Sequence, residues 1–164
     1  MEEITNPILS AKSNALKAIV FGGLLAGVLD LTAACVNSGL SGVSPVRVFQ
    51  AIASGLLGAQ SYRGGAATAA LGVFLHFVIA FGATFFYYLA SRRIKFLINQ
   101  PYISGILYGI AVYCFMQLVV LPLSSFPGRG RFELTQAVVG LIIHAHFVGL
   151  PVALVVRHYS KSER

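Results

Sequence analysis

Four long blocks of apolar residues constrain this chain more than any other feature of its sequence. They cover residues 15–36, 66–90, 102–121 and 134–156 of the 164 in the chain. An α-helix of about 20 residues crosses a hydrocarbon core about 30 Å thick, so each block is long enough to span a bilayer. The chain is 57% hydrophobic and only 10% charged, which excludes a soluble domain of ordinary composition. The sequence therefore predicts a single all-α membrane domain over residues 1–164, with four transmembrane helices in a bundle.

A shorter helix is predicted between the first two blocks, over residues 45–57. Ser44 is a suitable N-cap, and Pro45 fits the first turn of a helix. Apolar residues then recur at helical spacing. The opposite face carries Arg47, Gln50 and Ser54. The segment is too short to span, so we expect it to lie in the membrane interface or to dip into the bundle.

The charge distribution indicates an orientation rather than a nucleic-acid partner. The net charge is +7, but the basic residues stand singly or in small groups beside the apolar blocks. Four spans place both termini on one side, with eight Lys and Arg residues there against four on the other. The richer side carries Lys12, Lys17, Arg92, Arg93, Lys95, Arg157, Lys161 and Arg164, and the poorer side Arg47, Arg63, Arg129 and Arg131. By the positive-inside rule, both termini face the cytoplasm.

Five polar residues inside the apolar blocks are the candidate site: Asp30, His76, Gln117, His144 and His146. Such residues usually face the interior of a bundle and often mark function. Stripes of small residues on the first two spans share a face with Asp30 and His76, which predicts that both point inward. Gln117 continues a comparable stripe on the third span. His144 and His146 lie about 200° apart around their helix, so only one of them faces a given partner.

These residues leave three interpretations open. They can satisfy one another by hydrogen bonding and so fix the packing of the helices. Alternatively, Asp30, His76 and a fourth-span histidine form a proton-responsive or cation-binding cluster, with Gln117 as a hydrogen-bonding partner. In the third interpretation, His76 and either His144 or His146 ligate a haem iron, as in an electron-transfer subunit.

No motif in the chain indicates catalysis. The sequence has no Walker loop, no HExxH, no GxSxG and no paired carboxylates, which favours a protein without enzymatic activity. A structural subunit of a larger membrane complex is therefore a further hypothesis. The glycine-rich helix faces also predict self-association within the bilayer.

Several short motifs stand in order along the chain: Gly23-Leu24-Leu25-Ala26-Gly27, Ser44-Pro45 followed by Arg47, His76 eleven residues before Tyr87, Gly105 and Gly109 leading to Pro122-Leu123, and His146 eleven residues before Arg157. Together they resemble a family of bacterial inner-membrane proteins of unknown function that includes YagU. The resemblance implies a four-span inner-membrane protein connected with acid tolerance. It also favours His146 over His144. The family can carry histidine at the position of Gln117 and serine at that of Asp30, which weakens any haem or metal role that needs a third-span histidine.

Overall fold

The predicted helices are present, and two of the four long ones are interrupted. The computed structural model describes residues 7–128 and 133–161, and every regular element in these ranges is helical. The first two long helices are α1 (Pro7–Leu40) and α3 (Gly65–Ser91). The third consists of α5 (Pro101–Phe115), η2 (Met116–Val120) and α6 (Leu121–Leu123), and the fourth of α7 (Leu134–Ile143), η3 (His144–Gly149) and α8 (Leu150–Lys161). Arg129, Arg131 and Arg164, which enter the charge count, lie outside the described residues.

The surface of these helices suits lipid rather than water. Four segments are long and apolar enough to cross a membrane: Ser13–Leu40, Gly65–Ser91, Pro101–Leu123 and Leu134–Ser160. Large apolar side chains cover their outer faces; Phe74, Phe86 and Leu118 are each more than 60% exposed. A soluble monomer rarely exposes apolar surface on this scale. Together these findings confirm the predicted fold class of a multi-pass, all-α membrane bundle.

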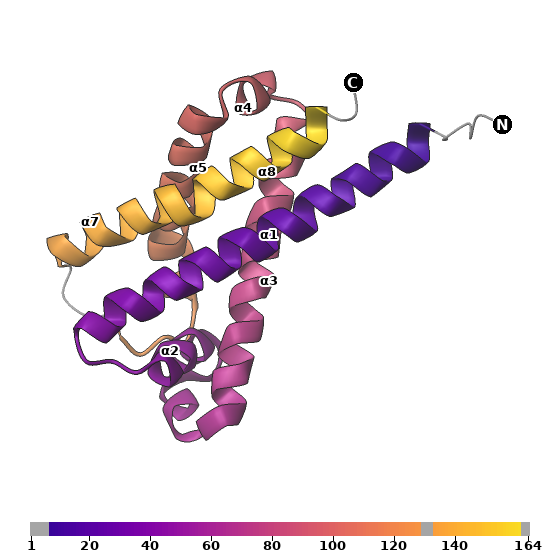
Figure 1. Ribbon diagram of the computed structural model, residues 1–164. Coiled ribbons are helices and arrows are strands. Elements are labelled where there is room, and N and C mark those ends of the chain that lie inside the picture. The colour runs from indigo at the N-terminus through magenta and orange to yellow at the C-terminus, as the bar shows by residue number, and fades with distance from the viewer. Residues whose placement is uncertain (1–6, 129–132, 162–164) are drawn as a thin grey trace.

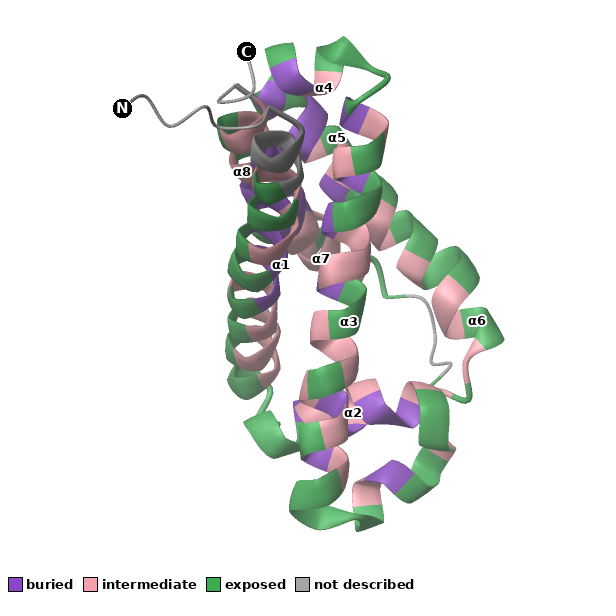
Figure 2. Ribbon diagram, turned by 90° about the vertical axis from the view of Figure 1, so that its right-hand side faces the viewer, coloured by how far each residue is buried: buried purple, intermediate pink, exposed green. Residues whose placement is uncertain are grey.

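The two ends of the bundle differ in construction. Figure 1 shows the start of α1 and the end of α8 at the same end as α4 (Lys95–Asn99), a short helix that the sequence did not predict. We call this end the terminal half and the opposite end the α2 half. The hydrophobic core cluster of the described residues belongs mainly to the terminal half, where buried positions are dense in Figure 2. Its members are Ala18, Ala26, Tyr87, Ile98, Val152, Ala153 and Val156.

Helix α2 (Pro45–Leu57) occupies the predicted position, but part of its polar face is turned toward the protein. Ser44 caps the helix by accepting a hydrogen bond from the Arg47 N–H, and a 3₁₀ turn, η1 (Gly58–Arg63), follows it. Gln50 and Ser54 are buried, and the Gln50 Nε2 donates to the Gly65 carbonyl at 3.1 Å. The amide can be buried because this carbonyl, at the start of α3, gives it an acceptor.

Glycines allow helix backbones to approach closely at several crossings, of which two bear on the site. A Cβ on Gly72 of α3 would collide with the carbonyl of Phe49, which explains how α2 lies directly on α3. A Cβ on Gly109 of α5 would collide with the backbone of His144, so the third and fourth spans meet there without intervening side chains. Small residues at such crossings let membrane helices approach backbone to backbone.

The interruptions η2 and η3 are π-helical turns, and each one precedes a proline. Pro122 follows η2, and Pro151 follows η3. A proline ring clashes with the carbonyl four residues before it and cannot donate the usual hydrogen bond. Those carbonyls belong to Leu118 and Phe147, inside the two π turns. The wider π turn relieves this clash, and it changes which side chains face the interior on either side of the turn.

Candidate functional site

The α2 half contains a cavity of about 500 Å³ between α1, α2, α3, η2 and η3. Most of its walls are aliphatic, and volumes of about 300 to 1,000 Å³ are typical of sites that bind small molecules. The titratable residues that line it are Asp30, His76 and His144. They come from the first, second and fourth spans, so the fold brings together three of the five residues that the sequence singled out.

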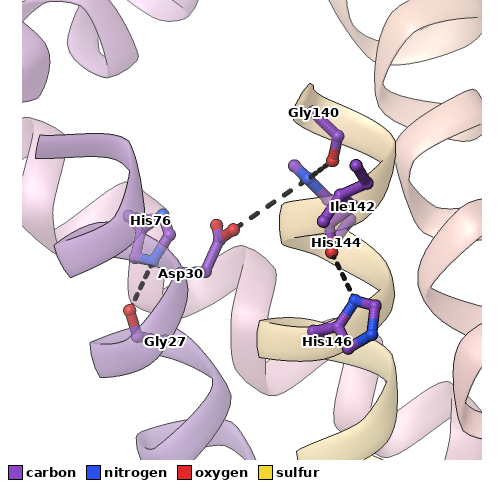
Figure 3. A network of polar contacts seen from close by, with 7 residues as sticks. All are labelled: Gly27, Asp30, His76, Gly140, Ile142, His144 and His146. Carbon is purple, nitrogen blue, oxygen red and sulfur yellow. Dashed lines mark hydrogen bonds and ion pairs between the residues drawn. The ribbon is translucent and has the colours of Figure 1, made fainter. Parts of the chain in front are cut away.

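Asp30 projects from α1 toward the fourth span. Its carboxylate oxygen Oδ1 lies 4.0 Å from Nδ1 of His144, and the two side chains are 17% and 21% exposed. Figure 3 shows this contact as the one that reaches Asp30. Among the described residues, no group lies close enough to donate a hydrogen bond to the carboxylate. Such a charge at membrane depth is costly unless a proton or a cation neutralises it.

His76 is half-buried on α3 and bonded to the neighbouring helix. Its Nε2 lies 2.9 Å from the carbonyl oxygen of Gly27 on α1, one turn before Asp30. Because a carbonyl can only accept, Nε2 must carry the proton in this bond. In the neutral ring Nδ1 is then an acceptor. The bond also ties α1 to α3 beside the carboxylate.

His144 has the opposite tautomer. Its Nδ1 lies 2.9 Å from the carbonyl oxygen of Gly140, one turn earlier in the same span. Nδ1 therefore donates to that carbonyl, and Nε2 is the acceptor of the neutral ring. The ring also packs edge-on against Tyr113 of α5, with 5.2 Å between centroids.

The other two candidates lie outside the cavity. His146 is exposed on the outer face of η3, and its Nδ1 lies 2.9 Å from the carbonyl of Ile142 in its own span. Gln117 is also exposed and does not line the cavity, although it follows Tyr113 by four residues. Residues four apart lie on the same face of a helix only where it has 3.6 residues per turn. This regular geometry ends at Met116, where the π turn η2 begins. Met116 therefore lines the cavity where the sequence placed Gln117.

Two contributors were missed from the sequence. Tyr113 supports His144, and the Gly27 carbonyl fixes His76. The aromatic side chain on the third-span stripe was a usable sequence signal for Tyr113. The Gly27 carbonyl had no such signal, because a backbone carbonyl within a helix cannot be recognised as a partner until the neighbouring helix is placed beside it.

The site does not have the donor set of a protein-only metal centre. Among the described residues, no group of three His, Cys, Asp or Glu side chains could hold one metal ion. Haem ligation by His76 and a fourth-span histidine stays a prediction. In the observed arrangement such a ligand would be Nδ1 of His76, since Nε2 is bonded to Gly27.

Comparison with known proteins adds no relative. The chain matches no protein-family model, no curated protein and no solved structure. The resemblance to the YagU family therefore continues to rest on the sequence motifs alone.

Proposed function

We propose that this protein is a bacterial inner-membrane protein without enzymatic activity, in which Asp30, His144 and His76 form a proton-responsive cluster. The observation that carries the proposal is the 4.0 Å approach of the Asp30 carboxylate to His144 across two different spans. Imidazole ordinarily changes charge between about pH 5 and pH 8, so this pair can respond to physiological acidification.

The response follows from the hydrogen bonds of the two imidazoles. In its neutral form each ring donates its single proton to a carbonyl. A proton taken up by His144 creates an imidazolium next to Asp30, and the attraction between them draws α1 toward η3. Among the described residues that line the cavity, the remaining titratable group is His76 on α3; from α5, the Tyr113 ring packs against His144. Protonation therefore favours a tighter α2 half.

A fluorescence titration tests this function because Tyr113 packs against His144. The parent protein in lipid nanodiscs should change its tyrosine emission between about pH 8 and pH 5. Tyr113→Phe should remove most of this change, which assigns the signal to that ring. Asp30→Asn should shift the midpoint and His144→Gln should abolish the response.

The control is His146→Gln, which alters a histidine in the same π turn but outside the cavity. It should titrate like the parent. If Asp30→Asn and His144→Gln also titrate like the parent, the cluster serves only helix packing.

The proposed topology places both termini and the 91–100 loop in the cytoplasm, since that side carries eight of the twelve basic residues. The α2 half would then open on the periplasmic side. Reporter fusions at residue 164 decide between the two orientations: a cytoplasm-active reporter should work there, and a periplasm-active one should not.

Self-association within the bilayer belongs to the same proposal. His146 is exposed on the outer face of the fourth span, where lipid offers its imidazole ring no hydrogen-bonding partner. A second copy of the chain would cover it. His146→Leu should lower the dimer fraction in single-molecule photobleaching, whereas Phe147→Leu should not; unchanged dimer fractions in both would remove this support.

A further inference from the structure

Among the described residues that line the cavity, none is a Lys or Arg that could pair permanently with the Asp30 carboxylate. His76 and His144 are the members of this lining that can become cations, and both N–H groups of the neutral rings point at carbonyls. The Ser124 hydroxyl also lines the cavity and donates to the Leu121 carbonyl. While the histidines are neutral, these polar groups therefore offer the cavity hydrogen-bond acceptors, and one of them is the carboxylate of Asp30.

Apart from Ser124, the rest of the cavity lining is apolar; it includes Leu31, Leu75, Val112, Val148 and Phe126. An apolar body with one cationic centre complements such a cavity in both polarity and charge. A hydrated metal ion does not, because the walls offer it too few oxygen ligands.

The cavity also reaches the lipid-facing surface. Val78 and Ile79 of α3 line it and are 50% and 40% exposed. Helix α3 packs chiefly on α1 and α2, whereas η2 packs on its own span. A molecule dissolved in the bilayer therefore has a lateral route into the cavity.

Two contacts bound this route. Toward the terminal half, the Tyr108 hydroxyl donates to the carbonyl of Ala83 at 2.6 Å and joins α5 to α3. At the opposite end, the Ser125 N–H donates to the carbonyl of Gly55 at 2.8 Å and holds the 124–126 segment against α2. Between Leu75 and Ala83 the α3 wall is about 12 Å long, at 1.5 Å rise per residue.

We infer that this cavity binds a lipophilic organic cation, with its charged centre beside Asp30 and its apolar body along α3 and η2. The inference uses the same carboxylate as the proposed proton response, but it needs Asp30 to be anionic and does not need His144 to titrate.

Tetraphenylphosphonium is a suitable probe, with tetraphenylborate as an anion of closely similar shape. Binding of the radiolabelled ions is measured by scintillation proximity on the full chain in nanodiscs at pH 8. The phosphonium should bind saturably with one ion per chain, and the borate should bind at least about tenfold more weakly.

Two variants make the result specific to the cavity. Asp30→Asn keeps the shape of the side chain and should lower phosphonium affinity by about tenfold or more. Ala51→Leu adds volume to the cavity wall from α2 without changing a charge and should also weaken binding. His146→Gln lies outside the cavity and should bind like the parent.

Equal binding of the two ions, or undiminished phosphonium binding by monodisperse Asp30→Asn, overturns the inference. If Asp30→Asn does not fold, Ala51→Leu provides the test, and undiminished phosphonium binding by that variant overturns the inference. A protein that titrates through His144 but binds no phosphonium retains the proposed function and loses only this inference. A protein that binds phosphonium but whose Tyr113 emission does not change with pH retains this inference and loses the proposed function.

Discussion

In the terminal half Tyr87 is completely buried, and its hydroxyl is bonded to the Leu97 carbonyl at 3.0 Å and to Ser104 at 2.9 Å. In the α2 half Asp30 has no hydrogen-bond donor among the described residues and faces a cavity of about 500 Å³. The terminal half bonds its buried Tyr87 hydroxyl internally and packs around it. The α2 half leaves the acceptors of Asp30 facing a cavity. A single bundle thus combines a densely packed half with a half that contains the proposed site.

The largest effect should come from the helix crossing that links the two halves. Gly109→Ala places a methyl group against the His144 backbone, where two spans cannot separate without disturbing the α5–α8 contacts. We expect a loss of about 3 kcal/mol in the free energy of unfolding, measured in mixed detergent micelles. Gly82→Ala is the control, because its Cβ meets nothing within 4 Å. That variant should gain up to about 1 kcal/mol from helix propensity.

A smaller loss is expected where α2 rests on α3. Gly72→Ala collides with the Phe49 carbonyl, but α2 is a short helix that can shift outward. We expect about 2 kcal/mol of destabilisation in the same unfolding assay. Phosphonium affinity should change as well, because α2 forms one wall of the cavity. A loss as large as that of Gly109→Ala would mean that the α2 half is as rigid as the terminal half.

Removing one hydroxyl from the terminal half should lower the free energy of unfolding by less than either glycine substitution does. Tyr87→Phe deletes two hydrogen bonds but leaves Ser104 donating to the Leu97 carbonyl at 3.1 Å. We expect a loss of about 1 kcal/mol in the unfolding free energy. Phosphonium binding and the pH response should not change. An altered pH response would show that the two halves are coupled.

The smallest effect should come from Gln117→Leu. This side chain is exposed and outside the cavity, so proton response and phosphonium affinity should both match the parent. Met116→Leu, at the neighbouring position, lines the cavity and is the matched comparison. If Gln117→Leu alters phosphonium binding while Met116→Leu does not, the π turn does not determine which side chains of this span face the cavity.

The sequence predicted the spans and the inward position of Asp30 and His76, because hydropathy and small-residue stripes depend only on regular helices. It failed to place Gln117, because the π turn η2 interrupts the regular spacing there. Helical spacing could not choose between His144 and His146, which lie in η3, and the family resemblance favoured His146, whereas His144 lines the cavity. Pro122 and Pro151 were the available signal, since an interior proline disturbs the helix over the four residues before it. The short helix α4 had no comparable signal, since its five residues are too few to show a period.

The length of α1 makes the thickness of the surrounding membrane a variable of the site. Its apolar part, Ser13–Leu40, has 28 residues and is about 42 Å long, against a hydrocarbon core of about 30 Å. Such a hydrophobic mismatch is accommodated by tilting the helix or by thickening the bilayer around it. Asp30 belongs to the continuous helix α1, whereas His144 belongs to the fourth span, which has 27 residues and is interrupted by η3, so we expect the two spans to tilt differently. Vesicles with short and long acyl chains should then hold the carboxylate and the imidazole at different separations, and lipid composition should shift the proposed proton response.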